Sequence, residues 1–141
     1  MIISSACFWN VQKFFDQHEF VSDSICGYTG GTSASPTYEN AKKDGHVEAV
    51  KITFKSEHYQ DLLKFFFDEY PTKRIKVQNE MHGKKFRGRL FYHTLEEKEL
   101  FEKMRLKYDD EETLTLILPA KDFYPAEDYH QNKYMKRCAK K

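Results

Sequence analysis

The stretch GHVEAVKITF, Gly45–Phe54, decides the fold, because it holds the clearest strand of the chain. Val50, Ile52 and Phe54 recur at every second position, which is typical of a β-strand with one face against a core. Glu48 belongs to the same face. Loss of water there disfavours the charged carboxylate and raises its pKa, so a proton stays bound closer to neutral pH. Taken alone, such a glutamate is better explained as a strand-edge residue or a buried ion-pair partner.

Segments with helical and strand periodicity alternate on both sides of this stretch. Strands are expected at 2–5, 20–27, 46–54, 90–92 and 113–118, and helices at 7–17, 35–43, 57–70 and 94–107, with a loop and then a short helix within 123–131. Thr94 followed three residues later by Glu97 is a capping box, and Ser35-Pro36 matches an N-cap with proline at the first helical position. Strands that alternate with helices predict an α+β or α/β arrangement around one sheet.

The composition indicates a single globular domain over residues 1–141. No apolar run approaches the ~20 residues that span a bilayer. The start of the chain lacks the basic flank and apolar region of a signal peptide, so we expect a cytoplasmic protein, and a monomer. The three cysteines form no C-x-x-C pair and lack suitably spaced histidines, so neither a disulfide scaffold nor a metal site is expected.

The net charge is +1, but basic residues gather in two segments. One is Pro71–Leu90, where Glu80 is the single acid, and the other is a tail from about residue 133, which we expect to be mobile. A basic patch that reads nucleic acid needs a groove-reading motif or stacking aromatic residues beside it. Neither accompanies these segments, so we expect solvated surfaces and no nucleic-acid partner.

The stretch SACFWNVQ, Ser5–Gln12, places Cys7 at the start of the first expected helix, directly before Phe8 and the only tryptophan, Trp9. The free N–H groups and the dipole of a first helical turn favour a thiolate, and such positions lower a cysteine pKa into the ~3.5–7.5 range. From this alone, a reactive Cys7 and a buried structural one are equally supported. A thiolate paired with a carboxylic acid such as Glu48 suits attack on a polarised centre whose oxygen must be protonated.

Three stretches resemble the peptide methionine sulfoxide reductase A family: ACFWNVQ (6–12), GYTGGTSASPTYENAKKDGHVEAVKITF (27–54) and FYPAEDYHQNKY (123–134). The family patterns G-C-F-W-G-x-E, G-Y-x-G-G-x-x-x-x-P-x-Y, G-H-x-E-x-V and F-Y-x-A-E-x-x-H-Q occur in the same order with similar spacing. The resemblance implies an α+β fold, a ferredoxin-like α/β plait with a single sheet, flanking helices and long coil. It also implies thiol-dependent reduction of the S-form of methionine sulfoxide, without a cofactor, and with thioredoxin or a similar dithiol as reductant.

The resemblance also implies roles for individual residues. Cys7 matches the family's nucleophile, Glu48 its proton donor, and Tyr38 a tyrosine that hydrogen-bonds the sulfoxide oxygen. Phe8 and Trp9 match the residues that hold the substrate's methyl group. In the implied reaction Cys7 becomes a sulfenic acid, which a second thiol converts to a disulfide.

The segment 78–88 departs from the family pattern G-N-D-x-G-T-Q-Y-R-S. The family's aspartate falls on Met81 in an ungapped alignment, and a shift of one residue puts Glu80 in this substrate-binding place instead. Phe86 takes the place of a second active-site tyrosine and lacks its hydroxyl group, a loss that can cost ~10²–10³ in rate. A diverged enzyme or a binding module that uses the Cys7 pocket on another, anionic substrate or partner therefore stays an alternative.

The resolving thiol has more than one candidate. Cys138 lies in the basic tail, which suits a thiol that must swing toward Cys7, whereas direct reduction of the sulfenic acid by an external thiol is the alternative. Cys26 lies on an expected strand, where a cysteine is more often a small buried hydrophobe. Near Cys7, Gln12 replaces the glutamate of the family pattern.

Overall fold

The computed structural model of the protein describes residues 1–4, 8–41, 43–69, 88–108 and 115–131. The strands are β1 (Ile2–Ser4), β2 (Val21–Thr29), β3 (Val47–Phe54), β4 (Arg89–Tyr92), β5 (Leu116–Pro119) and β6 (Phe123–Pro125). The helices are α1 (Phe8–Asp16), α2 (Tyr59–Glu69) and α4 (Leu95–Tyr108), with short 3-10 helices η1 (Ser56–His58) and η3 (Asp128–His130). Within these described ranges, no helix has the length and apolar character needed to cross a membrane.

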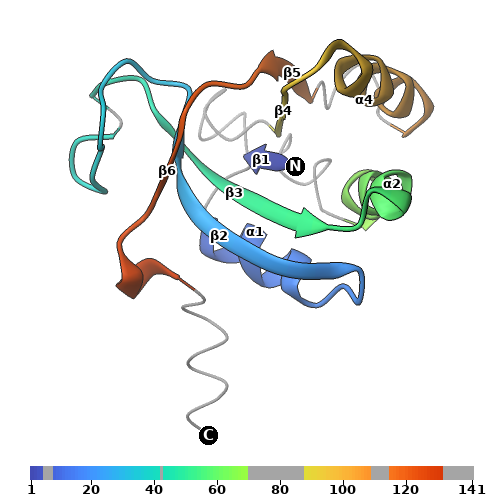
Figure 1. Ribbon diagram of the computed structural model, residues 1–141, viewed down its shortest axis with the longest axis horizontal. Coiled ribbons are helices and arrows are strands. Elements are labelled where there is room, and N and C mark those ends of the chain that lie inside the picture. The colour runs from blue at the N-terminus through green and yellow to red at the C-terminus, as the bar shows by residue number, and fades with distance from the viewer. Residues whose placement is uncertain (5–7, 42, 70–87, 109–114, 132–141) are drawn as a thin grey trace, which may run out of the picture.

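The strands form one six-stranded sheet in the order β5-β4-β1-β3-β2-β6 (Figure 1). Strand β1 lies antiparallel between β3 and β4, and β2 is antiparallel to β3. The run β1-α1-β2-β3-α2-β4 with the spatial order β4-β1-β3-β2 is the ferredoxin-like plait, so the expected fold is confirmed. Strand β5 adds a parallel neighbour beyond β4, and β6 adds an antiparallel one beyond β2.

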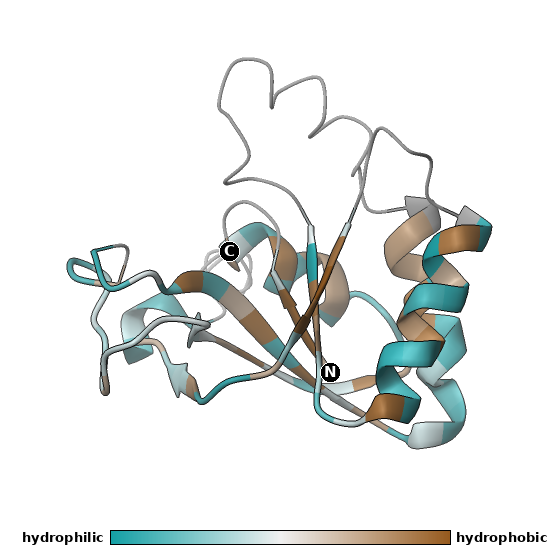
Figure 2. Ribbon diagram, turned by 90° about the horizontal axis from the view of Figure 1, so that it is seen from above, coloured by the Kyte–Doolittle hydropathy of each residue, from teal (hydrophilic) through white to brown (hydrophobic). Residues whose placement is uncertain are grey.

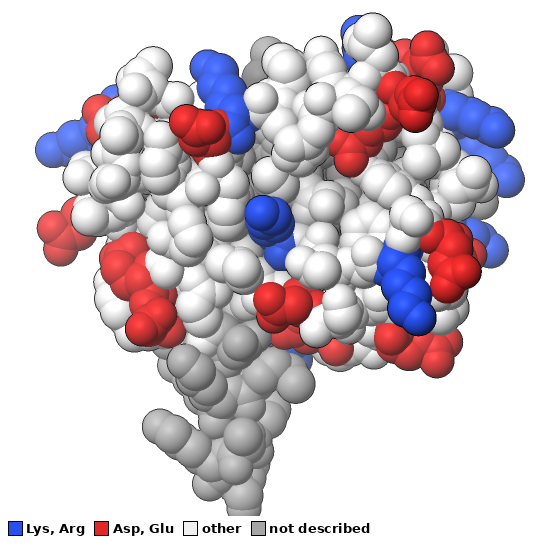
Figure 3. Space-filling view, in the orientation of Figure 1, with Lys and Arg blue, Asp and Glu red and all other residues white. Residues whose placement is uncertain are grey.

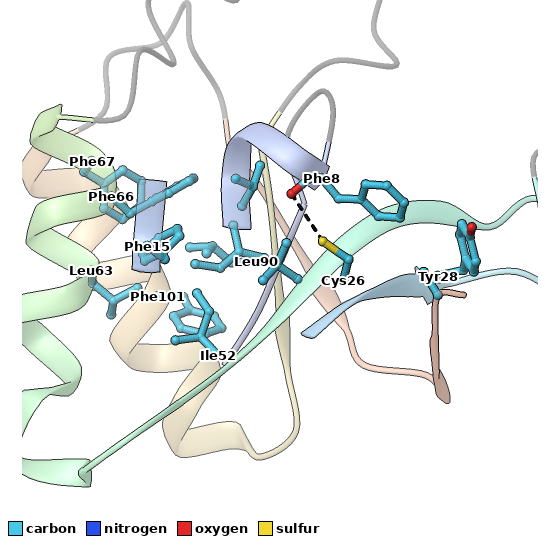
Figure 4. Close-up of a cluster of buried hydrophobic side chains, with 14 of the residues drawn as sticks. Phe8, Phe15, Cys26, Tyr28, Ile52, Leu63, Phe66, Phe67, Leu90 and Phe101 are labelled. Carbon is cyan, nitrogen blue, oxygen red and sulfur yellow. Dashed lines mark hydrogen bonds between the residues drawn. The ribbon is translucent and has the colours of Figure 1, made fainter. Parts of the chain in front are cut away.

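The main core lies between one face of the sheet and the three helices (Figures 1 and 2). The alternation expected for β3 is confirmed, because Val50 and Ile52 are buried on this face and Phe54 packs against its edge. Full burial of side chains of this size contributes about 1.5–3 kcal/mol each. The helices supply Phe8 and Phe15 from α1, Leu63, Phe66 and Phe67 from α2, and Phe101 from α4 (Figure 4). Val11 of α1 and Met104 of α4 belong to the same core.

The opposite face of the sheet carries a smaller apolar cluster of Ile2, Ala49 and Phe91. Strand β1 is central, and its neighbouring residues Ile2 and Ile3 are buried on opposite faces because side chains alternate along a strand. The same alternation turns Lys51 of β3 away from the helices, and it is exposed.

The helix expected at 35–43 is wrong for the residues that the structure describes, which form turns at 38–41 and 43–45. Ser35 has a φ of 51°, whereas an N-cap residue normally has an extended backbone. The Thr37 N–H donates to Asn40 Oδ1 at 2.7 Å, and Ala41 N–H donates to the Thr37 carbonyl at 2.9 Å. A side chain that binds the local backbone competes with helix formation, so the chain completes one turn only.

The N-cap half of the capping box at the start of α4 is confirmed, with the Glu97 N–H donating to Thr94 Oγ1 at 3.1 Å. The Glu97 carboxylate in turn accepts a hydrogen bond from the His93 N–H at 2.5 Å. It also accepts one from the Tyr59 hydroxyl group, which links α4 to the first residue of α2. Burial and this hydrogen bond raise the pKa of Tyr59.

Strand β6 was expected as part of a loop, and this expectation is wrong. Residues Gly27 and Thr29 of β2 pair with Pro125 and Phe123, which places β6 at the edge of the sheet. A Cβ atom on Gly27 would lie 2.4 Å from Cζ of Phe123, so this close approach requires glycine. This pairing places the segment that follows β6 beside α1 and beside the buried residues of β2.

The pairing of β2 with β3 also contains an irregularity that periodicity did not predict. The register shifts between Val21 and Asp23, which is a β-bulge. A bulge adds one residue to the strand, so Val21 and Ile25 lie on opposite faces although they are four positions apart. Beyond the bulge, Ser24, Cys26 and Tyr28 are buried on the helix-covered face.

Candidate active site

The N-terminus of α1 meets the carboxyl group of Glu48. The N–H of Phe8, the first residue of α1, donates to Glu48 Oε1 at 3.1 Å. Ser4 Oγ, at the end of β1, donates to the Glu48 carbonyl at 2.7 Å. The two contacts hold Glu48 at the positive end of the α1 dipole, directly beside the residue that follows Cys7 in the sequence.

Phe8 and Trp9 begin an aromatic cluster that continues into β2 and η3. The buried Phe8 ring lies 5.8 Å from Tyr28 and 5.4 Å from His130, measured between ring centroids. The half-buried Trp9 ring stacks on His130 at 5.6 Å and 28°. The Tyr38 ring lies 4.7 Å from His130 and is 46% exposed. Four of the predicted site residues, Phe8, Trp9, Tyr38 and Glu48, are thus joined by one continuous set of contacts.

Glu127, between β6 and η3, accepts hydrogen bonds from three tyrosines. Tyr28 Oη donates to Oε1 at 3.1 Å, and Tyr129 Oη donates to Oε2 at 3.1 Å. The backbone N–H of Tyr38 donates to Oε2 at 3.5 Å. Partial burial works against the carboxylate, but the hydrogen bonds outweigh it, so the pKa of Glu127 is lowered. Burial and the bond to Glu127 raise the pKa of Tyr28.

The glycine-rich loop before Tyr38 is anchored by His46. The Gly31 N–H donates to His46 Nδ1 at 3.1 Å, so the neutral ring carries its proton on Nε2, which donates to the Ser33 carbonyl at 2.9 Å. A Cβ atom on Gly31 would lie 2.5 Å from the His46 ring. The histidine and glycine of the motif therefore hold the loop that carries Tyr38, which is a structural role.

Cys26 and Gln12 form a buried polar pair beneath the start of α1. Cys26 Sγ donates to Gln12 Oε1 at 3.1 Å and lies 3.5 Å from the Phe8 carbonyl, as the dashed line in Figure 4 shows. Gln12 Nε2 donates to the Ser24 carbonyl at 3.1 Å. A neutral amide can both accept from the thiol and donate to the strand, whereas a glutamate at this place would be a buried charge. Gln12 therefore satisfies both the Cys26 thiol and the Ser24 carbonyl without a buried charge.

Four of the predicted site residues, Cys7, Glu80, Phe86 and Cys138, lie outside the described residues. So do most of the basic segment 71–90 and all of the tail from about 133, while acidic and basic side chains are interspersed over the face of the molecule in Figure 3. Glu127, His130 and Tyr28 were not predicted as site residues, although the quoted motifs contain all three. In the part of the chain that the structure describes, no group of three or more His, Cys, Asp or Glu could hold a metal ion.

The family model described as peptide methionine sulfoxide reductase matches residues 1–141. The chain belongs to this family. Among its relatives, a Peptide methionine sulfoxide reductase MsrA of Bacillus subtilis is 37% identical over 145 residues, which cover 96% of this chain and 82% of the relative. A protein of the same name from Pasteurella multocida is 36% identical over 137 residues, covering 92% of this chain and 79% of its own length.

Solved structures agree on the fold of this peptide methionine sulfoxide reductase family member. Reduced Mxr1 from Saccharomyces cerevisiae superposes with a TM-score of 0.79 at 22% identity, covering 98% of this chain and 86% of that one. Methionine sulfoxide reductase A of Corynebacterium diphtheriae gives a TM-score of 0.63 at 18% identity, covering 97% and 74%. The family resemblance of the motifs is therefore confirmed by the whole-chain match, and the plait by the solved structures.

Proposed function

We propose that this chain reduces methionine-S-sulfoxide, free or within proteins, to methionine, with Cys7 as nucleophile. The observation that carries the proposal is the hydrogen bond from Phe8 N–H to Glu48 Oε1. It sets a carboxyl group against the start of the helix that directly follows Cys7 in the sequence. An attack on sulfoxide sulfur needs a thiolate and a nearby group that can protonate the oxygen, and Cys7 and Glu48 are our candidates for these two roles.

The proposed reaction consumes one proton and transfers two electrons from the sulfur of Cys7 to the sulfur of the substrate. The Cys7 thiolate attacks the sulfoxide sulfur while Glu48 gives a proton to the oxygen and the Tyr38 hydroxyl group donates a hydrogen bond to it. The bond that the attack forms between Cys7 Sγ and the substrate's sulfur then breaks, together with the substrate's sulfur–oxygen bond, as the protonated oxygen bonds to Cys7 Sγ. Methionine leaves with its sulfur reduced by two electrons, and Cys7 is oxidised by two electrons to a sulfenic acid.

Phe8 and Trp9 form the apolar part of the proposed site. The Phe8 ring is buried and the Trp9 ring is half-buried, so an edge of the cluster remains accessible to a small group such as the substrate's methyl. We assign Glu80 and Phe86 to the remaining wall from their places in the family pattern. Without the hydroxyl group of a second tyrosine at Phe86, we expect a slower reaction than in relatives that have one.

For recycling we propose Cys138 as the resolving thiol. Its thiol condenses with the Cys7 sulfenic acid, which releases water and leaves a disulfide, and a dithiol such as thioredoxin then reduces that disulfide by exchange. Cys26 suits this role less well, because it is fully buried and its thiol is bound to Gln12. The cycle needs no prosthetic group, and a thiol-reducing compartment such as the cytoplasm is where it can run.

The test is a turnover assay with separate R- and S-sulfoxides of methionine and with dithiothreitol or thioredoxin as reductant. We expect turnover of the S-form alone, abolished in Cys7→Ser. Cys138→Ser should keep the first turnover and lose recycling by thioredoxin, whereas Cys26→Ser should keep both. An intact protein whose Cys7 forms neither a sulfenic acid nor a disulfide with any sulfoxide would refute the proposed function.

A further inference from the structure

The segment Ala126–Gln131 is clamped to β2 at both of its ends. The Ala126 N–H donates to the Cys26 carbonyl at 2.8 Å. The Gln131 side chain accepts from Cys26 N–H at 2.8 Å and donates to the Cys26 carbonyl at 2.9 Å. The amide of Gln131 thus pairs with one residue of β2 much as a neighbouring strand would. Between the two clamps, Glu127 and His130 are carried on a short, well-defined turn.

His130 holds the indole ring of Trp9. Trp9 Nε1–H donates to His130 Nδ1 at 3.2 Å, and the two rings are stacked. A histidine nitrogen accepts a hydrogen bond only when it carries no proton, so the neutral ring has its proton on Nε2. Nε2 lies 3.9 Å from Glu127 Oε2, where a negative charge favours a proton on the facing nitrogen. The imidazole is only 3% exposed, so both the position and the tautomer of its ring are set by these neighbours.

Glu127 holds the backbone of Tyr38. Oε1 is tied to the hydroxyl group of Tyr28, whose side chain is fully buried in β2. Oε2 binds the Tyr38 N–H at 3.5 Å and the Tyr129 hydroxyl group at 3.1 Å. The carboxylate therefore connects a fixed point of the sheet to an exposed loop. Hydrogen bonds to a charged acceptor are stronger than neutral ones, so they can hold a residue that is not packed into a core.

We propose that Glu127 and His130 are positioning residues of the reductase site, with His130 orienting Trp9 and Glu127 orienting Tyr38. The inference rests on the proposed function for what the two oriented residues do, but not for the contacts themselves. His130 acts on the wall that seats the substrate's methyl group, so its loss changes KM and the choice between substrates. Glu127 acts on the residue that stabilises the transferring oxygen, so its loss lowers kcat.

The first experiment uses the wild-type protein and needs no turnover. Trp9 is the only tryptophan, so its indole signals are read without subtraction of others. Nitrogen-15 NMR at pH 7 should show His130 as the neutral tautomer with its proton on Nε2 and a hydrogen-bonded Trp9 indole N–H. A proton on Nδ1, or an imidazolium ring, would overturn the proposal.

The second experiment compares His130→Phe, which removes the acceptor, with His130→Asn, whose carbonyl oxygen takes the place of Nδ1. Asn should retain the Trp9 emission and near-ultraviolet circular dichroism of the wild type, and Phe should shift both. Selectivity for methionine sulfoxide over its S-ethyl analogue should fall roughly tenfold in Phe and be largely restored in Asn. The control is His93→Phe, at a half-exposed histidine on the turn before α4, which should change none of these readings.

The role of Glu127 is tested by comparing Glu127→Gln with Glu57→Gln. Glu57 is an exposed glutamate in η1 and serves as the control. The amide keeps the volume but puts an N–H₂ group toward donors, so kcat should fall roughly ten- to hundredfold with KM nearly unchanged. A folded His130→Phe with wild-type Trp9 signals, or a folded Glu127→Gln with wild-type kcat, would overturn the proposal while leaving the proposed function standing. If His130→Phe does not fold, the proposal is decided by the readings on His130→Asn and by the His130 tautomer that NMR shows in the wild type. Absent turnover in the wild type would refute the function alone.

Discussion

Glu48 and Tyr28 stand directly opposite each other in the register of β3 and β2. The Glu48 carboxylate turns to the N–H of Phe8, and the Tyr28 hydroxyl group turns to Glu127. One cross-strand pair therefore connects the start of α1 with the segment that follows β6. Opposed residues in an antiparallel pair have Cβ atoms about 4.5–5.5 Å apart, so a substitution at either position alters the packing of the other side chain.

The first prediction concerns Glu48→Gln. The amide retains the size of the side chain but cannot give a proton to the sulfoxide oxygen, so the rate of Cys7 oxidation by the S-sulfoxide should fall about 10²–10³-fold. Single-turnover formation of the Cys7 sulfenic acid is the measurement. The matched control is Lys51→Gln, on the opposite face of the same strand, which should retain wild-type turnover. Equal rates in Glu48→Gln and the wild type would remove Glu48 from the reaction.

A second prediction follows from the close packing of β6 on β2. A Cβ atom on Gly27 would lie 2.5 Å from the Tyr124 carbonyl, which is backbone and cannot turn away. Gly27→Ala should therefore push β6 outward, lower the urea midpoint of unfolding and disturb the Trp9 signal through His130. Gly88→Ala, whose nearest contact would be 3.4 Å away, is the control and should be tolerated. An unchanged Trp9 signal in Gly27→Ala would show that the segment after β6 is held independently of that strand.

The third prediction concerns the core between α1 and α2. Phe15 is fully buried and stacks with Phe66 at 6.3 Å, so Phe15→Ala should lower the free energy of unfolding by about 3–5 kcal/mol. Leu106→Ala, at a residue that is 84% exposed on α4, should change it by less than about 0.5 kcal/mol. Urea titrations followed by far-ultraviolet circular dichroism measure both. Comparable losses at the two positions would contradict this placement of the core.

The fourth prediction concerns the ionisation of tyrosines at alkaline pH. Burial and hydrogen bonds to glutamates raise the pKa of both Tyr28 and Tyr59. A tyrosine whose pKa is raised in the folded state stabilises the folded protein fully below its unfolded-state pKa of about 10. This stabilisation is lost as the pH rises through the folded-state pKa. Two of the nine tyrosines should therefore stay un-ionised until the protein unfolds in alkali. Absorbance at the tyrosinate band, compared with Tyr28→Phe and Tyr59→Phe, measures this. A single titration of all tyrosines near pH 10 would count against it.

Much of the fold could be predicted because its signals are local. The alternation of Val50, Ile52 and Phe54 and the N-cap at Thr94 depend on backbone geometry over a few residues, and both were confirmed. Local signals failed at 35–43, where the Ser-Pro pair was interpreted as a helix start. There the side chain of Asn40 binds the backbone instead, an outcome that residue types alone do not decide.

The sequence by itself determined the strand that carries Glu48, the helix that follows Cys7 and the motif order typical of the family. Only the tertiary structure decided that β6 pairs with β2, and that His130 binds Trp9 across 121 positions of the chain. The reason is physical. Periodicity and capping arise from interactions between near neighbours, whereas the partner of a buried polar group is set by which distant segments the sheet brings together. The ring of His130 reaches Trp9 of α1, and the carboxylate of Glu127 reaches Tyr28 of β2, because β6 pairs with β2 and places the following segment there.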